Sequence, residues 1–187
     1  MPESDAECVS AYKAGNNSAL ETLYWRHAER VWRYARYFSG SDDTASEIVQ
    51  ETFVRVAQHL RSFEGRSQFS TWLFAIVRSV AIDQTTKRRR APAATEAETM
   101  EQVPASTPGP AEKLDNAETR AAVRAAIARL PENEREAVLL CEIEDLPLRT
   151  AGEILGWGEG RVKVTLFRAR RRLKELLAPH VGATGGS

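Results

Sequence analysis

The sequence predicts an all-α protein of two small helical domains joined by a flexible linker, the C-terminal domain containing a helix-turn-helix. Apolar residues recur at three- and four-residue steps along most of the chain, which is the spacing of one buried helix face. A proline-containing stretch without aromatic residues, from Ala91 to Glu112, separates two such parts. No alternation typical of strands, glycine-rich phosphate loop or internal repeat interrupts this pattern. The fold class follows from these three observations.

Length and composition are those of a globular protein. The 187 residues suffice for one large domain or two small ones, and 28% charged with 42% hydrophobic residues allow a sizeable core. The formal net charge of zero argues against a generally polycationic protein. No apolar run approaches the roughly 18 residues of a membrane span, and the polar N-terminus is unlike a signal peptide. We therefore expect a cytoplasmic protein.

The residues that usually bind metals or carry out catalysis are scattered. Cys8 and Cys141 are far apart, with no second cysteine or histidine close by, so they indicate neither a disulfide framework nor a zinc site. We expect Cys141 to be a small buried hydrophobe. The three histidines show no metal-ligand spacing, and adjacent acids at 42 and 43 are better explained as a helix start than as a catalytic pair. We predict no enzyme activity, no metal and no cofactor.

The first domain is expected to begin with a short helix over 5–13. Ser18 and Glu21 form a capping-box pattern, which predicts the start of a second helix of about twenty residues. Its predicted apolar face consists of Leu20, Leu23, Tyr24, Ala28, Val31, Ala35 and Phe38. This helix is also rich in aromatic residues, and we expect these to pack in the core: Tyr24, Trp25, Trp32, Tyr34 and Tyr37.

A third helix is predicted over about 43–61. Its buried face should hold Ala45, Ile48, Val49, Thr52, Phe53, Val56 and Leu60. Its other side is polar apart from one valine, with Glu47, Gln50, Glu51, Val54, Arg55 and Gln58. Ion pairing four residues apart, as between Glu51 and Arg55, would explain a merely solvated face. Periodicity alone leaves open whether this side binds a partner.

The loop over 61–71 contains two phenylalanines and two arginines. Exposed aromatic rings beside arginine suit bases that have left the stack, although such a loop more often places a phenylalanine in the core. The next helix should bury Leu73, Ile76, Val77 and Val80. It ends in four consecutive cations at 87–90, which suit both a helix C-terminus and a phosphate backbone.

These patterns predict four segments. The first domain covers 1–90, the linker 91–113, the second domain 114–178 and a disordered tail 179–187. The second domain should start with an alanine-rich helix that Pro131 stops, and the last helix should halt at Pro179.

Residues 148–167 have the pattern of two short helices joined by a tight turn. Gly156 lies where the turn needs a positive φ, Gly152 permits a close helix crossing, and Val162 is the apolar residue that would hold the second helix on the first. This is the spacing of a DNA-reading helix-turn-helix. Seven lysines or arginines and no acid follow from Arg161 to Lys174. The alternative is a helical hairpin with a solvated basic face.

With Val162 facing inward, Leu166, Ala169 and Leu173 share the buried side at 100° per residue. The opposite side carries Val164, Phe167, Arg171 and Lys174, flanked by Arg161, Lys163, Arg168, Arg170 and Arg172. Cations mixed with an apolar valine and phenylalanine suit phosphates and thymine methyls in a major groove. Which of the seven bases would read sequence is left open.

Two long segments resemble the extracytoplasmic-function group of bacterial sigma factors, the two-domain branch of the sigma-70 superfamily. The matching runs are ASEIVQETFVRVAQHLRSFEGRSQFSTWLFAIVRSVAIDQTTKRRR, residues 45–90, and ARLPENEREAVLLCEIEDLPLRTAGEILGWGEGRVKVTLFRARRRLKELL, residues 128–177. The resemblance implies a factor that binds core RNA polymerase, through the β′ clamp helices and the β flap, and directs it to promoter DNA. It also implies control by an anti-sigma factor and no cofactor.

The resemblance also assigns site residues. Those implied to bind core polymerase are Glu47, Ile48, Gln50, Glu51, Phe53 and Arg55. Those implied at the −10 element are Phe63, Arg66, Trp72, Arg78, Ser79, Lys87, Arg88, Arg89 and Arg90. Those implied at the −35 element are Arg161, Lys163, Val164, Phe167, Arg168 and Arg171.

Several positions depart from the sigma-factor pattern. Ser79 stands where family members often have asparagine, which implies an altered −10 preference. Val164 and Thr165 stand where the family often has serine and arginine, which implies more apolar contact at the −35 element. The alternative function is a free-standing helix-turn-helix repressor or activator, which would bind duplex DNA tightly without polymerase.

Overall fold

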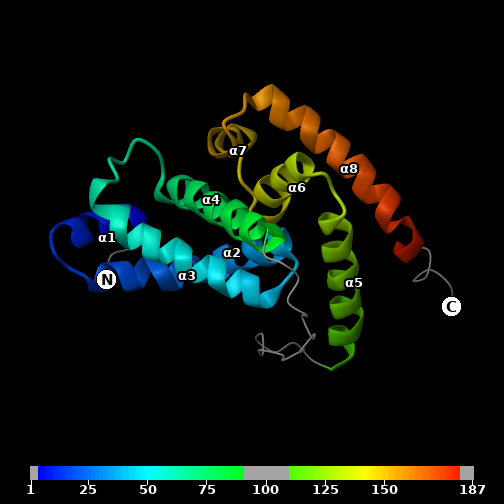
Figure 1. Ribbon diagram of the computed structural model, residues 1–187, viewed down its shortest axis with the longest axis horizontal. Helices are drawn as coiled ribbons and strands as arrows, with labels where there is room; N and C mark the ends of the chain where they lie inside the picture. Colours follow the sequence, from blue (N-terminus) through cyan, green and yellow to red (C-terminus); the bar gives the residue numbers. More distant parts are fainter. Residues whose placement is uncertain (1–3, 91–109, 182–187) are drawn as a thin grey trace.

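The computed structural model describes residues 4–90 and 110–181, without the side chains of 89, 110–117 and 179–181. Within these ranges the chain is helical, as expected from its sequence. Figure 1 shows α2, α3 and α4 packed together, with α6 and α7 between them and the long α8. The expected linker lies outside the described residues up to 109, and the expected tail does so from 182.

The first domain is a bundle of four helices and a short 3₁₀ turn. These are α1 (Asp5–Lys13), α2 (Ser18–Ser39), α3 (Asp42–His59), η1 (Leu60–Ser62) and α4 (Phe69–Arg90). Gly40 ends α2 in the left-handed conformation at φ 77°, and the Ser41 hydroxyl then accepts a hydrogen bond from the Thr44 backbone N–H to start α3. The apolar face predicted for α3 is buried throughout, including the fully buried Thr52.

Two expectations for α2 are wrong. Ser18 forms no capping box because its hydroxyl donates to the Asn16 side chain, and Asn17 is the residue that precedes the helix. The capping box of this domain lies at α1 instead, between Ser4 and Glu7. Trp25 and Trp32, which were expected in the core, are 71% and 39% exposed. They lie seven residues apart, on the side of α2 away from its buried face.

The second domain contains α5 (Pro110–Ala128), α6 (Glu132–Val138), the π-helical turn η2 (Leu139–Ile143), α7 (Leu148–Leu155) and α8 (Glu159–Val181). Helix α5 begins at Pro110, inside the range expected as linker. Helix α8 does not halt at Pro179, as had been expected, but continues to Val181. A proline in the last turn removes one N–H donor, and its fixed φ is compatible with a helix.

The two domains pack directly on each other. Helix α4 contacts α7, and α2 contacts α5 and η2. The buried apolar residues of both domains form a single cluster. This packing places the second domain against α4, where Glu136 pairs with Arg78, one of the residues that the resemblance assigns to the −10 element.

Candidate nucleic-acid interface

Helices α7 and α8 form the helix-turn-helix. Gly156 ends α7 in the left-handed region at φ 69°. A Cβ at Gly152 would lie 2.7 Å from the Trp157 carbonyl oxygen and 3.6 Å from a methyl of Val162, so only glycine allows this approach. Val162 and Ala169 are fully buried, and Leu166 is nearly so. Leu173, which was also predicted on this side, is half-buried at the edge of the core. The structure therefore confirms the predicted turn and the inward facing of Val162, Leu166 and Ala169.

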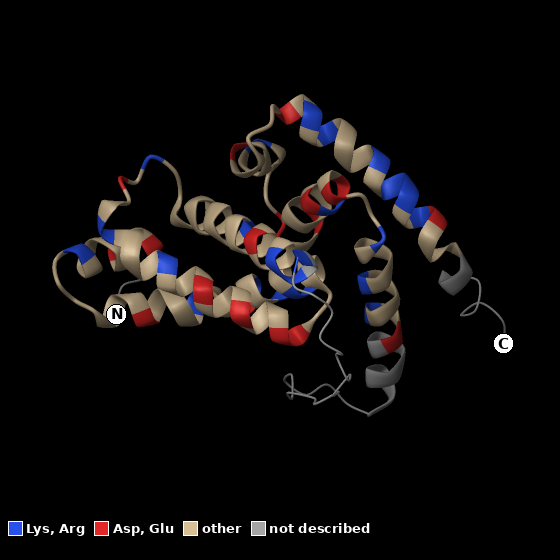
Figure 2. Ribbon diagram, in the orientation of Figure 1, with Lys and Arg blue, Asp and Glu red and all other residues tan. Residues whose placement is uncertain are grey.

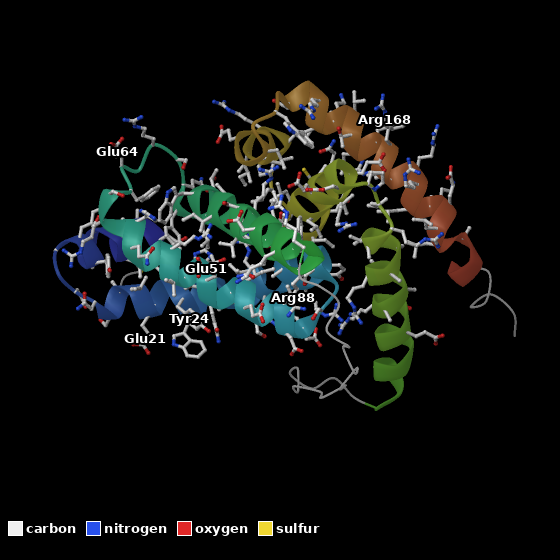
Figure 3. All side chains as sticks on the ribbon, in the orientation of Figure 1. Glu21, Tyr24, Glu51, Glu64, Arg88 and Arg168 are labelled. Atoms are coloured by element: carbon white, nitrogen blue, oxygen red, sulfur yellow. The ribbon has the colours of Figure 1, made fainter. Side chains whose placement is uncertain are left out.

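Burial of one side of α8 leaves the other side to solvent. Val164 and Phe167 are 51% and 69% exposed. Figure 2 shows lysines and arginines along α8, and Figure 3 labels Arg168 among them. The residues expected at the −35 element thus lie on an accessible helix face.

The structure separates the basic residues of α8 into two groups. Acids of the same domain bind Arg170 and Arg172, which pair with Glu142 on η2 and Glu134 on α6 at 2.5 and 2.9 Å. The hydrogen bond to Glu134 raises the pKa of Arg172. The guanidinium of Arg161 lies 4.2 Å from the centre of the Trp157 ring.

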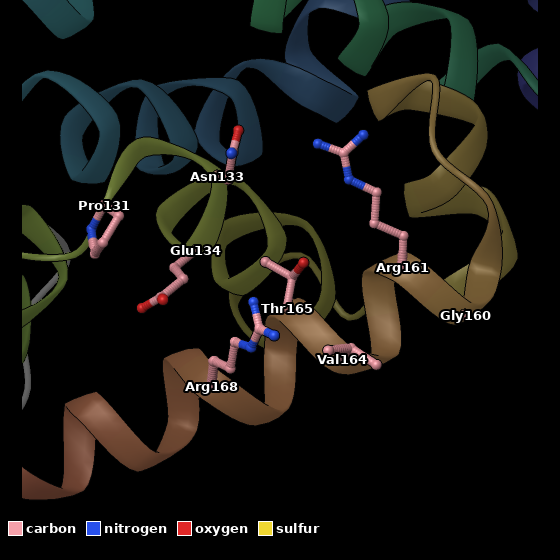
Figure 4. A pocket seen from close by; sticks show the side chains of 8 residues that line it. All are labelled: Pro131, Asn133, Glu134, Gly160, Arg161, Val164, Thr165 and Arg168. Carbon is pink, nitrogen blue, oxygen red and sulfur yellow. The ribbon is translucent and has the colours of Figure 1, made fainter.

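The second group is unconstrained. Within the described part of the chain, Lys163, Arg168 and Lys174 have no ion-pair partner, and Arg171 has only a 3.9 Å pair with Glu175. A groove between α6 and the start of α8 borders this group. Figure 4 shows its lining by Pro131, Asn133, Glu134, Gly160, Arg161, Val164, Thr165 and Arg168.

A second group of expected DNA-binding residues lies on the first domain. Phe63 is half-buried, and its ring lies 5.0 Å from Trp72 and 6.3 Å from the buried Phe69. Thus one phenylalanine of the loop enters the core and the other stays at the surface. Arg66 is mostly exposed and pairs with Glu64 at the loop tip, which Figure 3 labels.

The end of α4 presents the remaining −10 candidates. Ser79, Lys87 and Arg90 are exposed. Arg88 is exposed too and pairs with Glu47 of α3 at 3.4 Å. The side chain of Arg89 lies outside the described residues.

Arg78 is held in an ion pair in this arrangement, with its side chain 28% exposed. Its Nε donates to Glu136 of α6 at 2.7 Å, and the Glu136 side chain is 1% exposed. Burial raises the pKa of Glu136, and the hydrogen bond from Arg78 offsets part of that increase. Because the acid comes from the second domain, the domain contact engages a residue that the resemblance assigns to DNA.

A second buried carboxylate strengthens the same contact. Glu144 has a completely buried side chain and accepts hydrogen bonds from Arg30 and Arg33 of α2 at 3.0 and 3.1 Å. Burial raises its pKa, and both arginines oppose that rise. Sequence reasoning missed Arg30, Arg33, Glu136 and Glu144, since pairing between distant segments leaves no periodic signal.

The six residues expected to bind core polymerase occupy two faces of α3. Ile48 is fully buried and Phe53 is 9% exposed, where its ring packs 4.7 Å from Tyr24. Both therefore belong to the core and do not present a docking surface themselves. The other four lie outside it: Glu47, Gln50, Glu51 and Arg55.

The outer side of α3 is acidic with an apolar centre. Val54 is 49% exposed, and Arg55 is held by Glu51 at 2.8 Å and by Asp83 of α4 at 3.1 Å. Trp25 of α2 is exposed beside Tyr24, which packs on the Phe53 ring. The sequence did indicate that Trp25 is exposed. Trp25 follows the buried Leu23 by two residues, which places it on the opposite side of the helix.

Both domains match families of known proteins. Residues 23–91 match Sigma-70 region 2, and residues 120–173 match Sigma-70, region 4. The ECF RNA polymerase sigma factor SigE of Mycolicibacterium smegmatis is 33% identical over 176 residues, covering 92% of this chain and 68% of SigE. SigM of Mycobacterium tuberculosis is 32% identical over 174 residues, covering 93% of this chain and 85% of SigM.

A solved structure shows the same similarity. The sigma factor RpoE in complex with the anti-sigma factor NepR, from Bartonella quintana, has a TM-score of 0.68 and 28% identity, covering 84% of this chain and 96% of RpoE. The chain belongs to the extracytoplasmic-function RNA polymerase sigma factors. As such it directs transcription initiation and is not an enzyme.

Two further observations concern the described residues alone. None of the helices in 4–90 and 110–181 has the length and apolar character that crossing a membrane requires. In the same ranges no three histidines, cysteines or acids are grouped as metal ligands would be.

Proposed function

We propose that this chain binds core RNA polymerase and positions it on promoters by reading the −10 and −35 elements with separate domains. The proposal assigns 1–90 to polymerase binding and the −10 element, 91–113 to the linker, 114–178 to the −35 element and 179–187 to a tail. The observation that carries it is the outer side of α8, which is exposed, basic and part of a helix-turn-helix.

For the −10 element, we assign the aromatic surface of Phe63 and Trp72 to the unpaired bases. The half-buried rings form a platform on which a base can stack, and the exposed Arg66 lies in the loop that connects the two ring positions in the chain. Ser79 and the cations at the end of α4 follow along the same helix and would hold the strand, with Arg78 joining them when it leaves Glu136.

For polymerase, we assign the outer side of α3. Glu47, Gln50, Glu51 and Val54 present acids around an apolar residue, and acids repel nucleic acid. A protein partner with basic residues is the better fit, and the β′ clamp helices are the partner that the family suggests. We assign the β flap to the second domain on the same ground.

We also propose that an anti-sigma factor holds the chain inactive in the cytoplasm. RpoE of Bartonella quintana, which is similar over nearly all of its length, is found in complex with the anti-sigma factor NepR. This similarity supports such a partner and leaves its chemistry unspecified.

Two valines of equal exposure provide the test of these assignments. Val54 on α3 is 49% exposed and Val164 on α8 is 51% exposed. We expect Val54→Asp to weaken binding to core polymerase about tenfold, the effect of losing one central interface residue. Val164→Asp should leave core binding unchanged but reduce run-off transcription. Both affinities are measured by fluorescence titration of labelled chain with core enzyme.

The outcome also separates the two candidate functions. Equal core affinities of the two variants would contradict the docking surface on α3. If the unaltered chain forms no complex with core enzyme yet binds duplex DNA tightly as a dimer, it is a free-standing regulator and the proposal is wrong.

A further inference from the structure

Val164 and Phe167 are among the most exposed large apolar side chains in the described part of the chain. They lie on one side of α8, in its second and third turns, together with Arg168 and Arg171. We define this set as the outer strip: Val164, Phe167, Arg168 and Arg171. Two large apolar side chains that remain in water on a basic helix need an explanation, because burying them on the domain itself would be favourable.

The ion pairs of α8 show which side chains are free to reach DNA. Arg170 and Arg172 flank the outer strip but are held by Glu142 and Glu134. Arg168 has no ion-pair partner among the described residues, and Arg171 has only a long one. The free cations therefore surround the two apolar residues, and the constrained cations lie to either side.

The chemistry of the major groove limits what the apolar pair can meet. Its edges present hydrogen-bond donors and acceptors, and the C5 methyl of thymine is the apolar group among the four bases. The first turns of a recognition helix are the part that contacts base edges. Val164 and Phe167 make no hydrogen bond through their side chains, so the thymine methyl is the base-edge group against which they bury the most apolar surface.

We propose that Val164 and Phe167 select thymine in the −35 element by contact with its methyl group, while Arg168 and Arg171 bind the neighbouring phosphates. This inference rests on the proposed −35 role of α8 and specifies its chemistry. Specificity then comes from apolar contact at these positions, and Arg170 and Arg172 contribute to the fold of the domain.

The test removes the methyl and nothing else. Holoenzyme containing this chain is used to select a promoter from a pool of randomised duplexes, and each thymine of its −35 element is then replaced in turn by deoxyuridine. Deoxyuridine keeps every hydrogen-bonding group of thymine. We expect replacement at one or two positions to weaken binding about fourfold, as for loss of one buried methyl group.

Variants of the protein locate the contact. In Val164→Ser and Phe167→Ala holoenzymes, thymine and deoxyuridine should bind equally at the corresponding position, whatever the overall affinity. Arg170→Ala is the matched control, because it alters the same helix at a residue held by Glu142, and its thymine preference should persist.

The possible results lead to different conclusions. If the unaltered holoenzyme tolerates deoxyuridine everywhere in the −35 element, the inference is wrong and the promoter-binding function stands. If the thymine preference persists in both α8 variants, the methyl is read elsewhere and the inference is again wrong. If no duplex is selected at all, the proposed function fails, and this inference fails with it.

Discussion

His27 is a buried titratable residue at the contact between α1 and α2. Its side chain is 4% exposed, Nε2 lies 2.8 Å from a carboxylate oxygen of Asp5, and Nδ1 has no partner among the described residues. Burial lowers the pKa of His27 below 6.5, and Asp5 opposes this decrease. The ring is therefore held neutral in the folded domain.

This lowered pKa predicts how stability depends on pH. Between the pKa of the unfolded chain and that of the folded domain, the unfolded chain binds more protons. The free energy of unfolding should therefore decrease as pH falls below 6.5, by at most about 1.4 kcal/mol per pH unit for this residue. Urea denaturation at pH 7, 6 and 5 measures the decrease, which His27→Gln should reduce.

The exposed His59 of α3 provides the control, since His59→Gln should keep the full decrease. A His27→Gln variant whose stability changes with pH as steeply as that of the unaltered chain would contradict the prediction.

Individual residues also show where sequence patterns lose information. Periodicity placed Leu23, Val31 and Phe38 in the core correctly, because each repeats the spacing of one helix face. The expectation that Trp25 lies in the core is wrong, because it rests on aromatic residue type and not on the position of Trp25 around the helix. Residue type favours burial only on average, and the position on the helix decides it.

At the scale of the element, the helix-turn-helix was the most predictable part. Its local geometry requires three residues: a turn glycine with positive φ, a glycine at the helix crossing and a buried valine. All three lie close together in the chain, so a short stretch of sequence is enough to predict them. The ion pairs of Arg170 and Arg172 were not predictable. Their acids lie 28 and 38 residues earlier, and only the folded domain brings them together.

The close approach at Gly152 makes a quantitative prediction about this element. Gly152→Ala would place a Cβ 2.7 Å from the Trp157 carbonyl oxygen, a backbone atom that cannot turn away. We expect a loss of about 1–3 kcal/mol in the stability of the second domain, as for other overpacked sites. Thermal denaturation followed by circular dichroism measures it.

Gly160→Ala is the matched control on the next helix. A Cβ at Gly160 would meet nothing within 4 Å, so this change should be neutral or stabilise by up to about 1 kcal/mol. If both alanine variants unfold at the same temperature, the packing of α7 on α8 is looser than its geometry indicates.

At the scale of the whole molecule, the contact between the domains decides which surfaces are available. Glu136 and Glu144 are buried carboxylates that three arginines of the first domain bind. Arg78 donates to Glu136 through Nε and one terminal nitrogen, so a DNA strand can receive hydrogen bonds from these two nitrogens only after Arg78 leaves Glu136. Sequence periodicity identified both domains but not this contact, because a buried helix face does not specify which segment covers it.

Charge reversal provides a direct test of this contact. In the double variant Glu136→Arg and Glu144→Arg, cations would face Arg78, Arg30 and Arg33, and like charges in a buried interface repel strongly. We expect the domains to separate and the radius of gyration from small-angle X-ray scattering to increase, with helix content unchanged by circular dichroism.

Glu142→Arg is the control for this double variant, since Glu142 pairs with Arg170 inside the second domain and should leave the scattering unchanged. Adding Arg78→Glu to the double variant restores one opposite-charge pair and should reduce the radius of gyration again. Only a specific pairing of residues 78 and 136 explains that recovery. If Arg78→Glu leaves the radius of gyration of the double variant unchanged, other contacts hold the domains together.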